Sequence, residues 1–361
     1  MKICFIGPAN SAHIVKWCRW FSGRGHEIHV ISFTEGKIEN AQVHLIDISV
    51  NTGGGDLGKL KYMLTGGRIR KIVEEIKPDI VNVHYATSYG VAVALSGLKG
   101  YYLSVWGSDI YSFPKKSPLH KALLKFSLKR AGHLFSTSQA MADEAALYTD
   151  RKFHITPFGV DMELFHPSKR TRTDDGKLVI GTVKTLEHLY GIEYILRAAA
   201  IVREKRPDLD ICLRIAGNGP DAEKLKALAK DLKIDEITNF LGRIPQEEAA
   251  KEWANMDMAV IPSIYFESFG VAAVEAEACG TPVIISDVGG LKEATCPGES
   301  SIVVPTKDAA AIADAMIRLA DDKDLRAKMG SRGREYAIEK FEINTCFLDI
   351  EEQYMKTAKH N

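Results

Sequence analysis

Residues 258–286 read MAVIPSIYFESFGVAAVEAEACGTPVIIS, and this stretch decides the fold. The apolar run Met258–Ile261 has the length and composition of a buried strand, and the closing run PVIIS is a second one. Between them we expect a helix that begins at Ser268 or Phe269 and ends at Gly280, because glycine suits a helix C-terminus. Two buried strands joined by a helix form a parallel unit whose sheet is covered on both faces.

The same alternation of strand and helix extends in both directions along the 361 residues, which exceed the usual size of a single core. Further strands are expected at Lys2–Ile6, Ile28–Ser32, Ile80–His84, Tyr101–Val105, Leu134–Ser136, Leu178–Val183 and Ile211–Ala216. The polar segment Lys169–Lys177 separates the two halves like a linker. We therefore predict an α/β protein with two Rossmann-like domains facing each other across a cleft.

Composition is that of a globular protein, with 45% hydrophobic and 26% charged residues. The net charge is zero, but residues 1–166 carry 20 Lys and Arg against 14 Asp and Glu, which either favours an anionic partner or is a chance split. The six cysteines form no Cys-x-x-Cys pair, as is typical of reduced thiols in the cytosol. Because no apolar run approaches the ~20 residues that span a bilayer, we expect a cytoplasmic protein. We expect no metal, cofactor or nucleic-acid partner.

Two carboxylates flank the expected helix start, Glu267 before it and Glu275 within it. A helix N-terminus presents unpaired N–H groups and partial positive charge, which favours a diphosphate. Eight residues at a rise of ~1.5 Å separate the carboxylates by roughly 12 Å or less, which is comparable with the span of a nucleotide-sugar. One carboxylate can then bind sugar hydroxyls and the other ribose hydroxyls. We interpret Glu277 as an ordinary acidic residue of an amphipathic helix.

This segment resembles the E-x7-E signature of the family 4 retaining glycosyltransferases of GT-B fold, together with the runs ACGTPVI at 278–284 and DVGG at 287–290. The resemblance covers nearly the whole chain and is more specific in the second half. It implies transfer of a hexosyl unit from a nucleotide diphosphate sugar, with a UDP-sugar favoured, to a hydroxyl of a carbohydrate or lipid-linked acceptor in polysaccharide or glycolipid assembly. It also implies retention of anomeric configuration by a front-face route without a dedicated metal.

The resemblance assigns roles to the residues around the two carboxylates. Glu267 would contact the donor hexose and Glu275 the ribose. The other donor-binding residues that it implies are Ser268, Phe269 and Gly270 beside the sugar and phosphates, Gly217 and Gly219 in the turn LRIAGNGP beside the nucleotide, and Arg243 and Ile244 at the base.

The loop at 181–191, GTVKTLEHLYG, departs from the family pattern of Gly-Arg-Leu followed by Lys-Gly. Thr182 stands where Arg is expected, and Tyr190 where Lys is expected. Because a leaving diphosphate needs electrostatic stabilisation, we assign that role to Lys184, with His188 as an assistant. The alternative for Lys184 is a solvated loop lysine.

In the first half, Asn10, Ser11 and His13 follow the first strand and are predicted to meet acceptor or phosphate. His84 ends a later strand and is expected to be exposed in the cleft, with a core histidine as the competing interpretation. Asp109 closes the run SVWGSD, which is similar to the family's His-Gly-x-Asp stretch but has Trp in place of His. The predicted catalytic residues are Lys184, His84, Asp109 and Glu267.

The runs PFGVD at 157–161 and FHP at 165–167 match the family's interdomain segment. They place an N-terminal acceptor domain at 1–168 and a C-terminal donor domain at 169–342. The resemblance further implies that the last helix, at 343–361, packs back on the first domain.

Residues 115–130 hold six basic residues and no acidic one among leucines and a phenylalanine. This pattern favours either peripheral contact with the anionic inner face of a membrane or a solvated helix that covers the core. Two other motifs are discounted. The D-x-D at 208–210 lies on a turn into a strand, and the glycines at 53–55 have no helix directly behind them to hold phosphate.

Two rival functions stay open: a GT-B epimerase or phosphorylase that uses related substrates, and an inactive sugar-nucleotide-binding subunit of a polysaccharide assembly complex. The missing Arg and Lys at positions 182 and 190 motivate the second. An NAD-dependent dehydrogenase is disfavoured because no G-x-G-x-x-G follows the first strand.

Overall fold

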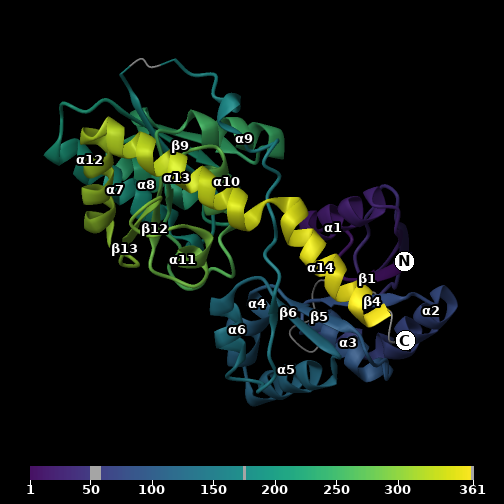
Figure 1. Cartoon of the computed structure of the whole chain (residues 1–361). Coiled ribbons are helices and arrows are strands. Elements are labelled where there is room, and N and C mark those ends of the chain that lie inside the picture. Colours follow the sequence, from purple (N-terminus) through teal and green to yellow (C-terminus); the bar gives the residue numbers. More distant parts are fainter. Residues whose placement is uncertain (49–57, 174–175, 359–361) are drawn as a thin grey trace. The chain divides into compact units, whose positions relative to one another are not determined.

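The computed structural model describes residues 1–48, 58–173 and 176–358 (Figure 1). The glycines at 53–55, linker residues 174–175 and the end of the last predicted helix, at 359–361, lie outside the described residues. The chain forms two compact units. Unit 1 comprises Met1–Pro157 together with the chain from Phe347 onward, and unit 2 comprises Phe158–Cys346.

Unit 1 is built on a parallel sheet with the strand order β3-β2-β1-β4-β5-β6-β7. Its strands are β1 (Lys2–Ile6), β2 (Glu27–Ser32), β3 (Gln42–Leu45), β4 (Ile80–His84), β5 (Tyr102–Val105), β6 (His133–Ser136) and β7 (His154–Ile155). The direction of the strand order reverses between β1 and β4. In doubly wound sheets, ligands bind at the carboxyl ends of the strands beside such a reversal.

Unit 2 repeats this plan with the parallel order β10-β9-β8-β11-β12-β13. Its strands are β8 (Leu178–Val183), β9 (Ile211–Ala216), β10 (Thr238–Gly242), β11 (Met258–Ile261), β12 (Val283–Ser286) and β13 (Ser301–Val304). The reversal here lies between β8 and β11. The two sheets confirm the predicted α/β class with two Rossmann-like domains.

Helices connect most successive strands within each unit (Figure 1), whereas β2 and β3 are joined by a segment without a helix. The α-helices of unit 1 are α1 (Ala12–Gly23), α2 (Gly66–Ile76), α3 (Ser88–Ser96), α4 (Ser108–Tyr111), α5 (Pro118–Arg130) and α6 (Gln139–Ala145). Those of unit 2 are α7 (Ile192–Lys205), α8 (Ala222–Asp231), α9 (Gln246–Asn255), α10 (Val271–Ala278), α11 (Leu291–Ala294), α12 (Ala309–Asp321) and α13 (Lys323–Phe341). The last helix, α14 (Ile343–Ala358), begins in unit 2 and continues into unit 1.

Five short 3₁₀ turns complete the chain: η1 (Gly58–Thr65), η2 (Phe113–Lys115), η3 (Pro167–Lys169), η4 (His188–Tyr190) and η5 (Asp235–Ile237), counted within the described residues. Buried side chains on α7 recur every three or four residues, so one face of that helix covers the sheet. The central strand β11 is apolar and buried along its whole length because helices lie on both faces of the sheet.

Within unit 1, α14 lies beside α1 (Figure 1). Phe347 is fully buried and contacts the rings of Trp17 and Trp20, with centroids 5.4 and 5.3 Å apart. Tyr354 is also fully buried, and its hydroxyl accepts a 2.8 Å hydrogen bond from Asn82 in β4. The end of the chain therefore completes the core of unit 1.

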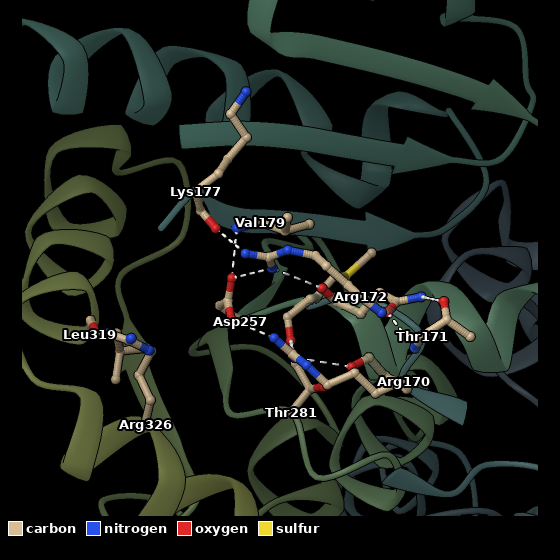
Figure 2. A network of polar contacts seen from close by, with 12 residues as sticks. Arg170, Thr171, Arg172, Lys177, Val179, Asp257, Thr281, Leu319 and Arg326 are labelled. Atoms are coloured by element: carbon tan, nitrogen blue, oxygen red, sulfur yellow. Dashed lines mark hydrogen bonds and ion pairs between the residues drawn. The ribbon is translucent and has the colours of Figure 1, made fainter. Parts of the chain in front are cut away.

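A polar network fixes the start of unit 2's central strands (Figure 2). Asp257 immediately precedes β11 and accepts hydrogen bonds from the Arg172 guanidinium at 2.7 Å, the Arg170 guanidinium at 3.2 Å and the Val179 backbone N–H of β8 at 2.8 Å. The carboxylate thus joins β8, β11 and the segment that leads into them. Fixing where these two strands begin also fixes where their carboxyl ends emerge, at the opposite edge of the sheet.

Candidate functional site

The candidate donor site of unit 2 lies at the carboxyl ends of β8 and β11. Lys184 is the first residue after β8, and its side-chain amine lies 2.8 Å from Oε2 of Glu267. The hydroxyl of Ser263 donates a 2.9 Å hydrogen bond to the same oxygen. The side chains of Lys184 and Glu267 are only 12% and 10% exposed, so the pair is largely shielded from water. Oε1 of Glu267 has no hydrogen-bond partner among the described residues and is left to accept one from a ligand.

The ring of Tyr190 forms a second contact for Lys184. The Lys184 amine lies 4.4 Å from the ring centroid, which is within the range of a cation–π interaction. Tyr190 stands at the position where the family has its lysine. The lost cation is therefore replaced by a ring that positions another cation.

Glycines allow the backbone under Glu267 to pack closely. Gly289 has φ +51°, and a Cβ added there would lie 2.2 Å from the carbonyl oxygen of Glu267. The N–H of Gly290 donates a 2.8 Å hydrogen bond to that same carbonyl. Gly191 makes a similar approach to Pro262, whose oxygen would lie 2.1 Å from an added Cβ. These glycines are explained by contacts within the protein.

Helix α10 begins at Val271, later than predicted, because Gly270 has φ +105° and caps it in the left-handed region. The N–H groups of Gly270, Val271 and Ala272 donate no hydrogen bond within the described residues. They form the electropositive end of the helix. The ring of Phe269 is buried at 1% exposure against Phe341, so this residue has only its backbone to offer a ligand.

Glu275 lies on the second turn of α10, where a neighbouring tryptophan orients it. Its Oε2 accepts a 3.3 Å hydrogen bond from the indole N–H of Trp253, a fully buried residue of α9. Glu275 itself is partly exposed. With α10 beginning at Val271, the Glu275 Cα lies only about 6 Å along the axis from the first helical residue, which shortens the span expected from the sequence.

The turn after β9 packs against the Lys184 loop. Gly217 has φ +140°, and an added Cβ would lie 1.8 Å from the carbonyl oxygen of Lys184. A Cβ on Gly219 would lie 2.3 Å from the Leu186 oxygen. Arg243, directly after β10, is exposed and has no hydrogen bond or ion pair among the described residues, and Ile244 is half-buried.

Thr182 lies within β8, is fully buried, and its hydroxyl has no hydrogen-bond partner in the described part of the chain. A side chain at that position faces the core of unit 2. Lys184 instead follows the strand directly, at its carboxyl end.

In unit 1, His84 is fully buried, which contradicts the expectation that it is exposed. Its ring lies among Trp17 and Trp106, at 4.8 Å from each centroid, and neither ring nitrogen has a hydrogen-bond partner among the described residues. Burial, with a smaller effect of the His13 charge, lowers the pKa of His84 to about 3. The strand-end position was correctly predicted, but aromatic rings cover it, as in the competing core interpretation.

Asp109 is also buried, at 1% exposure, rather than open to a crevice. Its carboxylate accepts backbone hydrogen bonds from Ala86 at 2.9 Å, Gly107 at 2.8 Å and Trp106 at 3.2 Å. Burial raises its pKa, and these hydrogen bonds oppose the rise. The carboxylate therefore ties together the loops that follow β4 and β5.

The three predicted residues after β1 differ in their surroundings: Asn10 and Ser11 precede α1, and His13 lies in its first turn. Asn10 is exposed and accepts a 3.3 Å hydrogen bond from the Thr34 hydroxyl, while Ser11 caps α1 without using its side chain. The ring of His13 lies 5.4 Å from that of Trp106. Burial, together with the charge of Lys16, lowers the pKa of His13 to about 3, so its imidazole is neutral near pH 7.

Comparisons with known proteins identify the family of the chain. A family model described as "Glycosyl transferases group 1" matches residues 167–336, and one described as "Glycosyl transferase 4-like" matches residues 2–138. The D-inositol 3-phosphate glycosyltransferase of Pseudarthrobacter chlorophenolicus is 33% identical over 86% of this chain and 81% of its own length. The chain belongs to the family 4 glycosyltransferases of GT-B fold. The corresponding protein of Stackebrandtia nassauensis is 34% identical to this glycosyltransferase over 78% of the chain and 70% of its own length.

Solved structures share the fold of this glycosyltransferase. Sucrose-phosphate synthase from Thermosynechococcus elongatus matches with a TM-score of 0.83 and 19% identity over the full length of both chains. Anabaena HepE in complex with UDP and glucose matches with a TM-score of 0.81 and 18% identity over 98% of this chain and 99% of its own.

Sequence reasoning missed three residues that the structure adds to the candidate donor site. Ser263 binds Glu267, Trp253 binds Glu275, and Tyr190 supports Lys184. Ser263 precedes Glu267 by four residues in the signature loop, which was a usable signal. No local pattern marks Trp253, since α9 and α10 meet only in the folded domain.

Glu277 is fully buried, so its interpretation as an ordinary acidic residue of an amphipathic helix is wrong. Its carboxyl accepts a 2.5 Å hydrogen bond from the Ser300 hydroxyl and packs against Gly333 of α13. Burial raises the pKa of Glu277 to about 8, and the Ser300 hydrogen bond opposes this rise. Both faces of α10 are covered by other parts of unit 2. Its glutamates gave the sequence the pattern of a solvent-exposed helix.

No group of three or more His, Cys, Asp or Glu side chains within residues 1–48, 58–173 and 176–358 is placed to hold a metal ion. Over the same ranges, no helix has the length and apolar character needed to cross a membrane.

Proposed function

We propose that this glycosyltransferase moves a hexosyl unit from a UDP-sugar to an acceptor hydroxyl with retention of anomeric configuration. The observation that carries the proposal is the shielded Lys184–Glu267 pair at the carboxyl ends of β8 and β11, next to the unpaired N–H groups at the start of α10. A cation, a carboxylate with a free oxygen and a helix N-terminus are the groups that a nucleotide diphosphate sugar needs.

The donor would lie over the start of α10. Its diphosphate would accept hydrogen bonds from the N–H groups of Gly270, Val271 and Ala272. The free Oε1 of Glu267 would accept from hexose hydroxyls, and Glu275 would bind the ribose hydroxyls while Trp253 fixes its orientation. Arg243 would lie along the base, and Ile244 would offer backbone groups to it.

Lys184 would stabilise charge on the leaving diphosphate. As the bond to the hexose breaks, negative charge grows on the β-phosphate, and a preorganised ammonium in a shielded site is worth more there than in water. Near Glu267 the ammonium is already desolvated and oriented, so little reorganisation accompanies the reaction. In a front-face reaction the leaving phosphate takes the proton of the acceptor hydroxyl, which requires no protein nucleophile.

The roles proposed for unit 1 are those that fit its burial pattern. Asp109 would act as a positioning residue, because it holds Trp106 and Ala86 through their backbone N–H groups. His84 would act through Trp106, against which it packs, and not through contact with substrate. Asn10, Ser11 and His13 would meet the acceptor or a phosphate.

UDP is the favoured nucleotide because Anabaena HepE, which shares the fold, was solved with UDP and with UDP-glucose. The acceptor is proposed to be a carbohydrate or a lipid-linked sugar in polysaccharide or glycolipid assembly. The name of the Pseudarthrobacter relative adds D-inositol 3-phosphate to the acceptors worth testing.

We also propose electrostatic contact of α5 with an anionic membrane surface. Leu124 and Leu128 face the core, whereas Lys121, Lys125 and Lys129 are exposed. The helix therefore offers charge more than an apolar face. Flotation with anionic liposomes at low salt is expected to carry the protein upward, and its failure to float would favour the solvated-helix interpretation.

A screen of donors separates this proposal from its rivals. Calorimetry with UDP-, GDP- and ADP-sugars identifies the nucleotide. Incubation of each donor with phosphate or with water alone reveals a phosphorylase if a sugar phosphate forms, or an epimerase if an epimerised sugar forms. Nucleotide release from a UDP-sugar that rises with added acceptor is expected. Binding without turnover of any donor would instead support the inactive binding subunit.

A further inference from the structure

An open pocket of about 310 Å³ lies in unit 1, at the amino-terminal ends of its strands. Tyr102, His133 and His154, the first residues of β5, β6 and β7, line it. In a parallel sheet the amino-terminal ends of the strands lie opposite the carboxyl ends, where Trp106 and Asp109 follow β5. Its volume reaches the lower range of small-molecule sites. The pocket is therefore separate from every residue that we assign to donor or acceptor.

The charged residues that line this pocket are all basic. The Lys152 amine is exposed and has no hydrogen bond or ion pair within the described residues. The Arg151 guanidinium donates three hydrogen bonds, of 2.6 to 2.7 Å, to the carbonyls of Leu128, Ala131 and Gly132. Two of its five N–H groups are left over for a ligand.

Neighbouring histidines add to this donor set. The exposed ring of His133 has no hydrogen bond among the described residues. Partial burial lowers the pKa of His133, and the positive charge of Arg151 lowers it further.

Two acidic residues of α14 that neighbour pocket residues are already paired. Asp349 of α14 lies 2.5 Å from the ring of His154, and Glu352 lies 2.9 Å from the Lys356 amine. Neither carboxylate lines the pocket. None of the residues that line the pocket in the described part of the chain carries a carboxylate, so an entering anion meets hydrogen-bond donors there.

The walls of the pocket are held in place by contacts between β5 and α14. The ring of His133 is stacked on that of Tyr102, with centroids 4.4 Å apart. The Tyr102 hydroxyl donates to the Gln353 carbonyl at 2.8 Å and lies 2.5 Å from the Thr357 hydroxyl. The side-chain amide of Gln353 has no partner in the described part of α14 and lines the pocket. A ligand would thus contact both the strand starts and the last helix.

We propose that this pocket binds the phosphate group of a small phosphorylated molecule, which Lys152, Arg151 and His133 hold while the Gln353 amide adds a hydrogen bond. A phosphate ester in solution and a lipid phosphate headgroup share this chemistry. Binding joins the starts of β6 and β7 to α14, so it reduces local opening of the part of α14 that packs on unit 1. The inference goes beyond the proposed transfer reaction and uses none of its residues.

Hydrogen–deuterium exchange on the full chain tests the proposal, because it reports where a ligand acts. Glycerol 3-phosphate serves as the soluble probe, glycerol as the phosphate-free control, and phosphatidylglycerol vesicles as the lipid probe. We expect glycerol 3-phosphate to slow exchange in peptides from 151–154 and 347–358, and glycerol to leave them unchanged. Protection of these peptides by the vesicles alone would assign the phosphate to a lipid. Equal protection by glycerol, or none with any phosphate probe, would overturn the proposal.

Variants separate this pocket from the donor site. Lys152→Ala is expected to weaken glycerol 3-phosphate binding about tenfold or more in calorimetry, because a charge-assisted hydrogen bond is lost. Lys71→Ala, at an exposed lysine of α2 that does not line the pocket, should bind as the wild type does. If Lys184→Ala abolished the binding and Lys152→Ala did not, the phosphate would belong to unit 2. That result would overturn phosphate binding in this pocket and would leave the proposed transfer reaction unaffected.

Discussion

The amine of Lys184 and the carboxylate of Glu267, 83 residues apart in the sequence, lie 2.8 Å from each other. The two residues follow neighbouring strands, β8 and β11, and the sheet brings them together. Neither side chain is more than 12% exposed. In a site this shielded, a charge is held by its partner and is little screened by water.

Removal of the Lys184 amine tests its assigned role. Lys184→Ala is expected to lower kcat by about 10²–10³-fold, the usual effect of losing a group that stabilises transition-state charge, while donor affinity changes less. Steady-state kinetics with calorimetry on the same variant measure both. Lys205→Ala removes an exposed ion pair with Asp314 and is the matched control. An unchanged kcat in Lys184→Ala would return this lysine to the solvated-loop interpretation.

The ribose assignment depends on Glu275 and the indole that orients it. Trp253→Phe removes the N–H donor but keeps an aromatic ring in the core. Loss of one hydrogen bond to a charged group is expected to weaken UDP binding by about tenfold, and Glu275→Ala should weaken it further. Calorimetry with UDP alone, without the sugar, isolates the nucleotide contacts. UDP affinity equal to that of the wild type in Glu275→Ala would show that the ribose binds elsewhere.

Gly217 allows the turn after β9 to approach the Lys184 backbone. Gly217→Ala places a Cβ 1.8 Å from the Lys184 oxygen at φ +140°, so the Lys184 loop must move. We expect a loss of unfolding free energy of about 3 kcal/mol and weaker donor binding. Gly25→Ala is the control, because Gly25 has φ +83° with no atom near an added Cβ. Thermal unfolding of the two variants should differ clearly, and equal melting temperatures would argue against the close approach.

The buried carboxyl of Glu277 predicts a pH dependence of stability. Its pKa is about 8 in the folded protein and near 4.5 when exposed, so the unfolded chain loses this proton first as the pH rises. Stability from the neutral carboxyl is full below pH 4.5 and is lost between pH 4.5 and about 8. Glu277→Gln keeps a neutral side chain at every pH. Its free energy of unfolding should therefore rise relative to that of the wild type between pH 4.5 and about 8, by several kcal/mol at most.

Melting temperatures of the wild type and Glu277→Gln, measured across pH 5 to 9, check this prediction. Glu247→Gln, at an exposed position of α9, should follow the wild type at every pH. A constant difference between Glu277→Gln and the wild type over the whole range would show that Glu277 is ionised in the fold.

The sequence predicted the central strands well because they are buried on both faces. Leu178–Val183, Ile211–Ala216 and Met258–Ile261 were predicted with the bounds that the structure gives. The strands that were not predicted lie toward the sheet edges. Strands there are less buried, so their sequences need fewer apolar residues. β7 consists of only His154 and Ile155, and β3 carries Gln42 and His44 on a partly exposed strand.

The site was predictable only where its residues are near each other in the sequence. Glu267, Glu275 and the helix that carries Glu275 were predicted from one continuous stretch of sequence. The helix begins later than predicted because Gly270 adopts a left-handed backbone conformation. The burial of His84 was not predictable, because Trp17 and Trp106 that cover it come from distant segments. The partnership of Lys184 with Glu267 depends in the same way on strand order, which local patterns do not contain.

Retention is the most demanding part of the proposed reaction, and it can be tested before the acceptor is known. Water can replace the acceptor, so the anomer of hexose first released from UDP-α-glucose can be followed by proton NMR before mutarotation. We predict that α-glucose appears first in the wild type and that Lys184→Ala releases it far more slowly. Initial release of β-glucose, or release at equal rates from both proteins, would contradict a retaining transfer at the Lys184–Glu267 site.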